Sequence, residues 1–282
     1  MNPLGGRVAA VTGAASGLGR AMALAFASEG MHLALCDIDE SLLSRTRDDI
    51  AALGVKSFSM RVDVSKAAEV DAFAQRCLDE LGAIHLVCNN AGVALSGPVW
   101  ETSEAEWEWI LGVNLRGVVH GVRAFAPRLI AQDEGHIVNT ASVAGLISPP
   151  GMGAYAVSKH GVVALSEALH HDLAERGSRV GVSVLCPAYV PTGIADSKPP
   201  QPVVKSKERL AKEAALRKAV AAGKLSAGDV ARAVVAAVKE NRFYVLTHPA
   251  IKSAVRARME DVLAERAPRD PLTLRAPRDG SG

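Results

Sequence analysis

Short apolar segments alternate along the chain with longer segments in which hydrophobic residues recur at helical spacing. The short segments predict β-strands at residues 7–12, 31–36, 55–61, 84–88, 136–141, 180–185 and 243–247. The longer segments predict helices at residues 21–29, 41–53, 66–81, 104–131, 155–176, 204–222 and 227–239. This alternation predicts an α/β fold in which one doubly wound parallel sheet is covered by helices on both faces.

No change of composition divides the chain before about residue 250, so we expect a single domain over residues 1–250. Residues 251–282 are expected to form a C-terminal helix followed by a tail. In this tail the sequence Ala-Pro-Arg-Asp occurs at residues 267–270 and again at residues 276–279. Its proline and charged residues indicate a mobile tail. An arm that reaches a neighbouring subunit is the alternative.

Composition narrows the classes of function. Charged residues make up 22% of the chain and the net charge is +2, which argues against nucleic acid as the main partner. The apolar stretches are shorter than the ~18 residues of a membrane helix, and no signal peptide opens the chain, so we expect a cytoplasmic protein. The charge is unevenly placed, because residues 203–224 carry seven basic and two acidic side chains.

The residue types that bind metals lack the spacing of a metal site. Cys36, Cys77, Cys88 and Cys186 form no C-x-x-C pair, and each lies in or beside an apolar run, which indicates buried reduced thiols. The eight histidines include no H-x-x-x-H pair. We therefore expect no metal, and a zinc-dependent alcohol dehydrogenase is disfavoured. No serine lies in G-x-S-x-G, which disfavours an esterase.

A glycine-rich turn follows the first predicted strand and leads into a helix. Glycines permit a tight turn and a close approach of backbone to a ligand, and the helix N-terminus offers N–H groups to a diphosphate. A strand-to-helix turn without a ligand is the alternative, but the position after the first strand favours phosphate binding. The turn comprises Thr12, Gly13, Ala14, Ala15, Ser16, Gly17, Leu18 and Gly19.

Asp37 ends the second predicted strand, 20 residues beyond Gly17. A carboxylate at this position can accept hydrogen bonds from a ribose 2′-OH and would repel a 2′-phosphate. The next residue is Ile38, so no adjacent basic side chain favours the phosphate. This arrangement favours NAD over NADP. A solvated strand end, with Asp39 as the cap of the next helix, is the alternative.

Tyr155 is the one tyrosine among three with a lysine four residues later, Lys159. On a helix the two side chains share a face. A nearby ammonium group lowers the pKa of a phenol from its usual value of about 10, which would let Tyr155 exchange a proton with an alcohol. Ser142, at the end of the fifth predicted strand, would hydrogen-bond a substrate oxygen. A surface Tyr–Lys pair is the alternative for this spacing alone.

Together these residues resemble the short-chain dehydrogenase/reductase family, over about residues 5–250. The glycine-rich turn is similar to the family's T-G-x-x-x-G-x-G element, and residues 89–92 match its N-N-A-G segment. Asn114, Ser142, Tyr155 and Lys159 match its catalytic tetrad in order and spacing. The resemblance implies a Rossmann fold and an NAD(P)-dependent enzyme that acts on CH–OH groups.

The resemblance also implies a role for each residue of the tetrad. Tyr155 would be the general acid/base, Lys159 would lower its pKa and bind the nicotinamide ribose, and Ser142 would position the substrate oxygen. Asn114 would hold a water molecule that links Lys159 to solvent. Hydride would pass between the carbinol carbon and C4 of the nicotinamide.

The cofactor contacts implied by the resemblance extend over much of the chain. Asp63 and Val64 would contact adenine, and residues 187–192 would hold the nicotinamide carboxamide. Ala188 stands where the family usually has glycine, so we expect a modest shift of this loop. The implied cofactor-binding residues are Gly13, Ser16, Gly17, Leu18, Gly19, Asp37, Asp63, Val64, Asn90, Ala91, Gly92, Tyr155, Lys159, Pro187, Val190 and Thr192.

A substrate lid is expected at residues 193–225, where the family places a variable loop. Its basic residues either cover a solvated helix or attract an anionic group on the substrate. The expected substrate pocket is mostly apolar, which suits a bulky hydrophobic secondary alcohol or ketone. The three tryptophans, near the start of the long predicted helix, are expected to anchor its packing. The expected substrate-binding residues are Ser142, Leu95, Met152, Tyr155 and Tyr189.

We therefore expect an oxidoreductase that transfers hydride between NAD and a hydrophobic secondary alcohol or ketone. An NADP-dependent carbonyl reductase and a cofactor-sensing Rossmann protein without turnover are the alternatives. The resemblance implies that the helices at residues 104–131 and 155–176 pair between subunits. A homotetramer or a dimer is expected, with a small-molecule substrate and no membrane or nucleic-acid partner.

Overall fold

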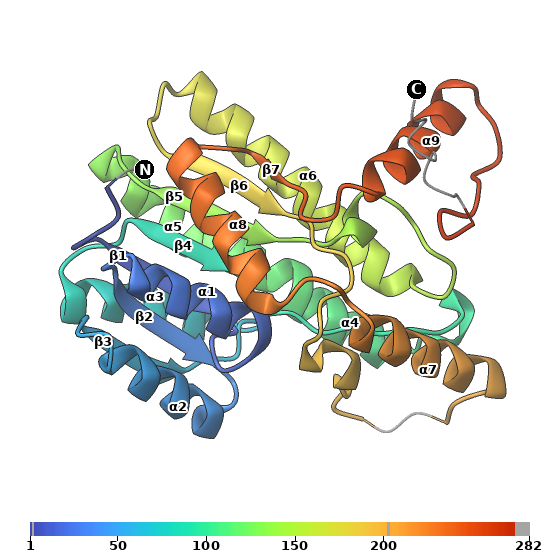
Figure 1. The fold of residues 1–282 in the computed structure, drawn as a ribbon, viewed down its shortest axis with the longest axis horizontal. Helices are drawn as coiled ribbons and strands as arrows, with labels where there is room; N and C mark the ends of the chain where they lie inside the picture. The colour runs from blue at the N-terminus through green and yellow to red at the C-terminus, as the bar shows by residue number, and fades with distance from the viewer. Residues whose placement is uncertain (2, 202–203, 274–282) are drawn as a thin grey trace.

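Within the residues that the structure describes (1, 3–201 and 204–273), seven parallel strands form one sheet. Their order in this computed structural model is β3-β2-β1-β4-β5-β6-β7 (Figure 1). The order reverses between β1 and β4, as in a doubly wound sheet, so the predicted fold class is confirmed. The strands are β1 (Val8–Thr12), β2 (His32–Asp37), β3 (Ser57–Arg61), β4 (Leu86–Asn89), β5 (His136–Thr140), β6 (Gly181–Leu185) and β7 (Tyr244–Val245).

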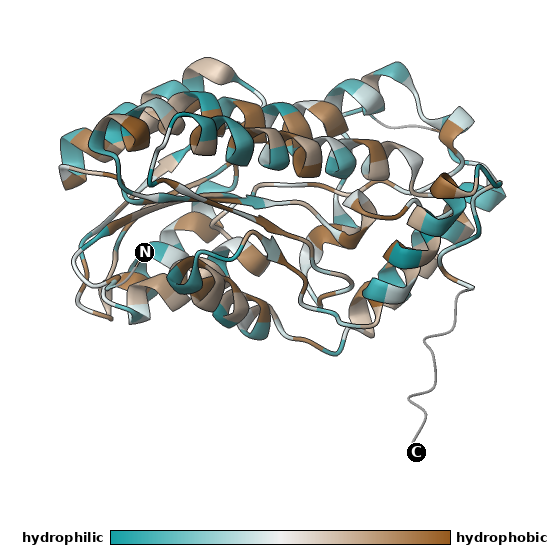
Figure 2. Cartoon of the chain, turned by 90° about the horizontal axis from the view of Figure 1, so that it is seen from above, coloured by the Kyte–Doolittle hydropathy of each residue, from teal (hydrophilic) through white to brown (hydrophobic). Residues whose placement is uncertain are grey.

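Helices cover both faces of the sheet, as the view from above shows (Figure 2). Successive strand residues serve opposite cores, with Ala9 and Leu33 in one and Ala10 and Ala34 in the other. Burial on both faces explains why the strands are apolar throughout. One face packs against α1 (Gly17–Ser28), α2 (Glu40–Ala51) and α8 (Ala227–Glu240), the other against α3 (Ala67–Leu81), α5 (Gly117–Gln132) and α6 (Gly153–Glu175).

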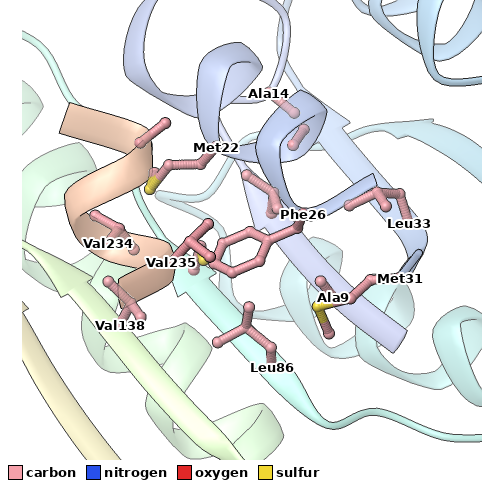
Figure 3. Packing of buried hydrophobic residues seen from close by; sticks show 14 of the residues in the cluster. Ala9, Ala14, Met22, Phe26, Met31, Leu33, Leu86, Val138, Val234 and Val235 are labelled. Atoms are coloured by element: carbon pink, nitrogen blue, oxygen red, sulfur yellow. The ribbon is translucent and has the colours of Figure 1, made fainter. Parts of the chain in front are cut away.

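Phe26 occupies the centre of the core on the face of α1 and α8 (Figure 3). Its ring is fully buried and shares one cluster with Val235 of α8, Leu86 of β4 and Val138 of β5. Aromatic residues make up only 4% of the chain, so most of the surrounding side chains are Ala, Val and Leu. This core fixes α1, and with it the glycine-rich turn that precedes it.

A π-helical turn interrupts the long helix that the sequence predicts at residues 104–131. The structure places α4 (Glu104–Leu111), the turn η2 (Gly112–Arg116) and then α5 in this segment. The expected helical segment is therefore present, but a π-helical turn at residues 112–116 divides it into two α-helices. Hydrophobic spacing does not reveal one extra residue in a turn, and such turns occur often at functional sites. Asn114 lies within it.

Two further helices lie beyond the carboxyl ends of the strands (Figure 1). α7 (Lys207–Ala221) belongs to the expected lid, and α9 (Ile251–Leu263) is the expected C-terminal helix. Arg269, which follows α9, is held against this helix, because its Nε donates a hydrogen bond to Asp261 over 2.9 Å. The second Ala-Pro-Arg-Asp segment, residues 276–279 of the expected tail, lies outside the described residues.

Candidate active site

A cavity of about 520 Å³ opens at the carboxyl ends of the central strands. This is where a doubly wound sheet places its ligands. The cavity is lined by Gly13, Ser16, Gly17, Leu18, Asp37, Asp63, Val64, Asn90, Ala91, Gly92, Ser142, Met152, Tyr155, Lys159, Pro187, Tyr189, Val190 and Thr192. Most of the residues expected to bind cofactor and substrate are thus brought together. Gly19, Leu95 and Asn114 are not among the lining residues.

The glycine-rich turn is closely packed against the segment after β4. A Cβ atom on Gly19 would lie 1.9 Å from the carbonyl oxygen of Gly13, and one on Gly13 would lie 2.8 Å from Cα of Ala91. Gly13 also has φ +66°, which disfavours other residues. Gly19 therefore acts through packing. The turn opens into the N-terminus of α1, whose first N–H groups suit a diphosphate, so these residues fit a dinucleotide.

Thr12 joins the two halves of this cofactor cradle. Its hydroxyl oxygen accepts hydrogen bonds from the backbone N–H of Asn90 (2.9 Å) and of Ala91 (3.0 Å). Nδ2 of Asn90 donates to the carbonyl of Thr12 over 3.1 Å, and Oδ1 of Asn90 accepts from the hydroxyl of Thr140 over 3.2 Å. The ends of β1, β4 and β5 are therefore fixed relative to one another.

Asp37 lines the cavity at the end of β2. One of its oxygens accepts from the backbone N–H of Ala15 (2.9 Å) and the other from that of Asp39 (3.1 Å). Asp39 is the side-chain cap of α2, accepting from the N–H of Leu42 over 3.0 Å. The expected helix cap is thus present, and the Asp37 carboxylate is half-buried beside the glycine-rich turn, where it can face a ribose.

Lys159 is buried beneath Tyr155. Its Nζ donates a hydrogen bond to the carbonyl of Thr140, the last residue of β5, over 2.9 Å. The same atom lies 5.9 Å from the centre of the Tyr155 ring. The exposed fraction is 2% for Lys159 and 8% for Tyr155. The expected Tyr–Lys pair is therefore part of the cavity wall, and the alternative of a surface pair is wrong.

Burial dominates the protonation of both side chains. It raises the pKa of Tyr155 to about 12, although a hydrogen bond with the Ser142 hydroxyl opposes this shift. Burial also lowers the pKa of Lys159 to about 8. The sequence interpretation expected Lys159 to lower the pKa of Tyr155. Loss of water around the phenolate outweighs the one opposing group, the Ser142 hydroxyl, and Lys159 is not among the causes of the raised pKa, so its expected effect on Tyr155 stays a prediction.

Ser142 faces the same cavity from the end of β5. Its Oγ accepts from the N–H of Ala144 over 3.1 Å and donates to the carbonyl of Pro187 over 3.4 Å. The second bond is long and weak, so the hydroxyl hydrogen can rotate toward a different acceptor. The Pro187 carbonyl also accepts from the N–H of Val143 over 3.0 Å. This contact holds the loop after β6 beside Ser142.

Asn114 is fully buried behind the cavity wall. Its side chain accepts from the N–H of Val93 (2.8 Å) and donates to the carbonyl of Val93 (2.9 Å) and to Oγ of Ser158 (3.1 Å). A Cβ atom on Gly92 would lie 3.4 Å from Oδ1 of Asn114 and 3.4 Å from Nζ of Lys159. The π-helical turn therefore brings Asn114 to the Gly92 backbone, with Lys159 close by.

The lining of the cavity differs in part from the residues expected there. Trp107 and Trp109 pack against the cluster around Ile110, as expected, but Trp109 also lines the cavity and Trp100 is 80% exposed. Leu95 does not line the cavity and is buried in a cluster with Ile110, so we no longer assign it to the substrate. Ser197, Lys198, Leu216 and Val220 line the cavity from the expected lid, and the unexpected lining residues include Val93, Ala94 and Val113. The family motifs do not cover most of these positions.

Comparison with known proteins identifies the family. The profile of the short chain dehydrogenase family matches residues 7–202. The chain belongs to the short-chain dehydrogenase family. It is therefore an oxidoreductase that acts on CH–OH groups with a nicotinamide cofactor, as the sequence predicted. Within the described residues, no helix combines the length and apolar character needed to cross a membrane.

Two curated relatives cover nearly the whole chain. A dehydrogenase/reductase of CLA biosynthesis from Lactiplantibacillus plantarum is 34% identical over 93% of this chain and 95% of its own length. A 1-deoxy-11-beta-hydroxypentalenate dehydrogenase from Streptomyces exfoliatus is 35% identical over 91% of this chain and 88% of its own. Both are named as dehydrogenases.

Solved structures similar to this chain include one in complex with NAD and one complexed with 5-hydroxy-NADP. A short chain dehydrogenase/reductase from Burkholderia phymatum in complex with NAD is 51% identical, with a TM-score of 0.94 over 97% of this chain and 100% of its own. An alcohol dehydrogenase from Thermococcus sibiricus complexed with 5-hydroxy-NADP is 29% identical, with a TM-score of 0.71 over 85% of this chain and 95% of its own.

Replacement of Gly19 by alanine tests the packing of the cofactor cradle. The added methyl group would lie 1.9 Å from the Gly13 carbonyl oxygen, so the turn must move. We expect Gly19→Ala to weaken NAD binding by about 10-fold or more, equivalent to about 1.4 kcal/mol, in an isothermal titration. Gly5→Ala is the control, because its methyl group would make an ordinary contact at 3.6 Å. Equal NAD affinity of the two variants would contradict the packing role.

Proposed function

We propose that the protein oxidises a bulky hydrophobic secondary alcohol with NAD, and reduces the matching ketone with NADH. The observation that carries this proposal is the arrangement of Tyr155, Lys159 and Ser142 on the wall of one cavity. Tyr155 reaches the cavity from a buried position, Lys159 lies below it, and the Ser142 hydroxyl is beside it. A proton donor, a cation and a hydrogen-bond donor thus meet where an alcohol oxygen can sit.

The protein's part in this reaction is the movement of one proton. In oxidation, Oη of Tyr155 takes the hydroxyl proton of the alcohol, the Lys159 ammonium stabilises the phenolate, and Ser142 hydrogen-bonds the substrate oxygen. When bound, NAD supplies the hydride acceptor at nicotinamide C4 and a positive charge close to the reacting atoms. Asn114 fixes the backbone of Val93, which follows Gly92 of the cavity wall, and we assign it the water-holding role of the family.

A preference for NAD follows from the carboxylate of Asp37. It lies in the cavity wall next to the exposed, apolar side chain of Ile38, and it would repel a 2′-phosphate. The NAD complex of the related Burkholderia phymatum protein supports this assignment. An NADP-dependent carbonyl reductase is the second candidate, supported by the 5-hydroxy-NADP complex of the Thermococcus sibiricus enzyme.

The substrate end of the cavity favours an apolar molecule with one anionic group. Its walls include Trp109, Met152, Ile194, Leu216 and Val220. Lys198 lies among them, exposed, and has no ion-pair partner among the described residues. A lysine at the edge of an apolar pocket suits a substrate carboxylate. The related enzyme named for a hydroxypentalenate, an anion that carries a hydroxyl group, supports this substrate class.

We further propose a cytoplasmic homotetramer, with a dimer as the alternative. The family resemblance assigns subunit contacts to the two long helical segments, here α4–α5 and α6. Val119 of α5 and Val157 of α6 are 38% and 51% exposed, so apolar side chains are available on both segments.

Both Tyr155 and Lys159 are present in the cavity wall, which favours an enzyme over a cofactor-sensing protein without turnover.

Loss of the Tyr155 hydroxyl should abolish turnover but not cofactor binding. We expect Tyr155→Phe to lower kcat for oxidation of decan-2-ol by about 1,000-fold, with the dissociation constant for NAD within about threefold of wild type. Because burial raises the pKa of Tyr155 to about 12 and oxidation needs the phenolate, wild-type kcat/KM should rise with pH. Reduction needs the protonated phenol, so kcat/KM for the ketone should not rise with pH. NADH absorbance follows both directions.

Tyr244→Phe is the control for this experiment, because Tyr244 is exposed and is not among the residues that line the cavity. It should keep its activity to within about 10-fold of wild type. Turnover by Tyr155→Phe at the wild-type rate, or an oxidation rate independent of pH between about 6 and 10, would exclude Tyr155 as the general base.

The Asp37 assignment is tested with a variant that removes the negative charge and keeps an acceptor for one of the two backbone N–H groups. Asp37→Asn retains an oxygen acceptor but removes the negative charge. We expect NADP binding to tighten by about 10-fold, with a smaller loss of NAD affinity, in fluorescence titrations with both reduced cofactors. Asp39→Asn is the matched control and should leave the ratio of NADP affinity to NAD affinity unchanged. Wild-type protein that binds NADPH as tightly as NADH would refute the preference.

The role of Lys198 is tested with two substrates that differ in one charge. We expect 9-hydroxydecanoate to be oxidised with a KM about 10-fold below that of its methyl ester, and Lys198→Ala to remove this difference. Lys207→Ala, at the exposed start of α7, should leave it intact. Equal KM values of the acid and the ester for the wild-type protein would exclude an anion site at Lys198.

A further inference from the structure

The lid helix α7 has almost no apolar anchor. Among its fifteen residues, the buried ones are Arg209 near its start and Val220 near its end. A helix that packs on a protein normally presents a broad apolar stripe to it. Something other than hydrophobic contact must therefore hold the first half of α7 in place.

A buried ion pair supplies this contact. Arg209 of α7 and Glu106 of α4 are 2% and 1% exposed. Both terminal nitrogens of the guanidinium group donate to the carboxylate, Nη1 to Oε2 over 3.1 Å and Nη2 to Oε1. Burial raises the pKa of Glu106, but hydrogen bonds from Arg209 and Ser103 outweigh this and leave the pKa lowered. The pair is thus bidentate and charged.

Neighbouring polar groups extend the contact around the pair. Nη1 of Arg209 also donates to the carbonyl of Glu101 over 3.3 Å, and Oγ of Ser206 donates to the Glu101 carboxylate over 2.8 Å. Nζ of Lys205 lies 2.7 Å from the Glu213 carboxylate. Glu106 is at the same time the capping-box residue of α4, accepting from the N–H of Ser103 over 3.0 Å. The start of α7 is therefore joined to the start of α4.

The aliphatic stem of Arg209 fits a space that only glycine leaves open. A Cβ atom on Gly97 would lie 2.9 Å from Cγ of Arg209, and Gly97 has φ +145°. Gly97 in turn donates its N–H to the carbonyl of Gly151 over 2.8 Å, and Lys212 of α7 lies over Gly151. The first half of α7 thus rests on two segments, around residues 97 and 151.

Each element joined in this way also lines the cavity. Trp109 lies one helical turn after Glu106 on α4, and Leu216 lies two turns after Arg209 on α7. Met152 follows Gly151 directly. Arg209 and Glu106 themselves are not among the lining residues. The pair can influence a substrate only by fixing the walls around it.

We propose that the Arg209–Glu106 pair anchors the lid helix α7 over the substrate end of the cavity and so sets the affinity for large substrates. Arg209 and Glu106 are positioning residues, and this role rests on the proposed function of the cavity. The pair also accounts for part of the basic character of the lid. Lys205, Arg209 and Arg217 are held by carboxylates, so these three of the seven basic side chains at residues 203–224 are not directed at a substrate.

A comparison of single and double variants separates anchoring from general stability. Loss of one partner leaves an unpaired buried charge, whereas replacement of both partners by apolar residues is often tolerated. The single variant Arg209→Met keeps the stem over Gly97 and removes the guanidinium group. The double variant Glu106→Met/Arg209→Met removes both charges. Arg217→Met is the control, because its ion pair with Asp196 is exposed on the same helix.

Hydrogen exchange of the full-length protein, read by mass spectrometry, gives the first result. We expect Arg209→Met to speed exchange in α7 by about 10-fold, with no change in β1 or α1, and the double variant to restore part of the protection. Unchanged exchange in α7 would refute the anchor. Faster exchange throughout the chain would show a general loss of stability instead.

Kinetics with two alcohols of different size give the second result. We expect Arg209→Met to raise the KM for decan-2-ol by about 10-fold, to leave the NAD dissociation constant within about twofold, and to reduce the preference for decan-2-ol over propan-2-ol. An unchanged preference despite a loosened α7 would exclude a role in substrate selection. If the wild-type protein oxidises neither alcohol, the proposed function fails, and the exchange result still decides whether the pair holds α7.

Discussion

The buried ammonium group of Lys159 is the constraint around which the active site is built. It is 2% exposed, and its hydrogen bond to the Thr140 carbonyl ties α6 to the last residue of β5. A cation in this position is costly, and burial lowers its pKa to about 8. In the proposed mechanism, this charge stabilises the phenolate of the neighbouring Tyr155. Gly92 and the π-helical turn that carries Asn114 lie close to this ammonium group.

The parallel sheet brings the other residues of the candidate site to the edge where Lys159 lies. Because all strands run in one direction, the glycine-rich turn after β1, Asp37 after β2, Asn90 after β4 and Ser142 after β5 meet at one edge. Thr12 and Asn90 link these ends through hydrogen bonds rather than through contact with a ligand. The cradle is thus largely formed by the chain itself, which reduces the ordering needed when a cofactor binds.

Local signals were enough to predict the fold and the motif residues. Short apolar runs that alternate with helical segments predict buried parallel strands, and the glycine spacing predicts the turn before α1. The remaining features depend on tertiary contacts that no local pattern encodes. Hydrophobic spacing did not reveal the extra residue of the π-helical turn, and Arg209 resembled a solvated lysine or arginine because its partner Glu106 is 103 residues away. The raised pKa of Tyr155 depends on burial by several elements, and the Tyr–Lys spacing alone carries no information on that burial.

Transfer of a labelled hydride tests the central claim most directly. The wild-type protein is incubated with NAD and secondary alcohols that carry deuterium on the carbinol carbon, including decan-2-ol and 9-hydroxydecanoate. If the buried Tyr155–Lys159 pair serves alcohol oxidation, deuterium appears at C4 of the nicotinamide in NADH, as read by mass spectrometry and NMR. Reduced cofactor without the label, or no reduction of NAD by any of these alcohols, would contradict the account.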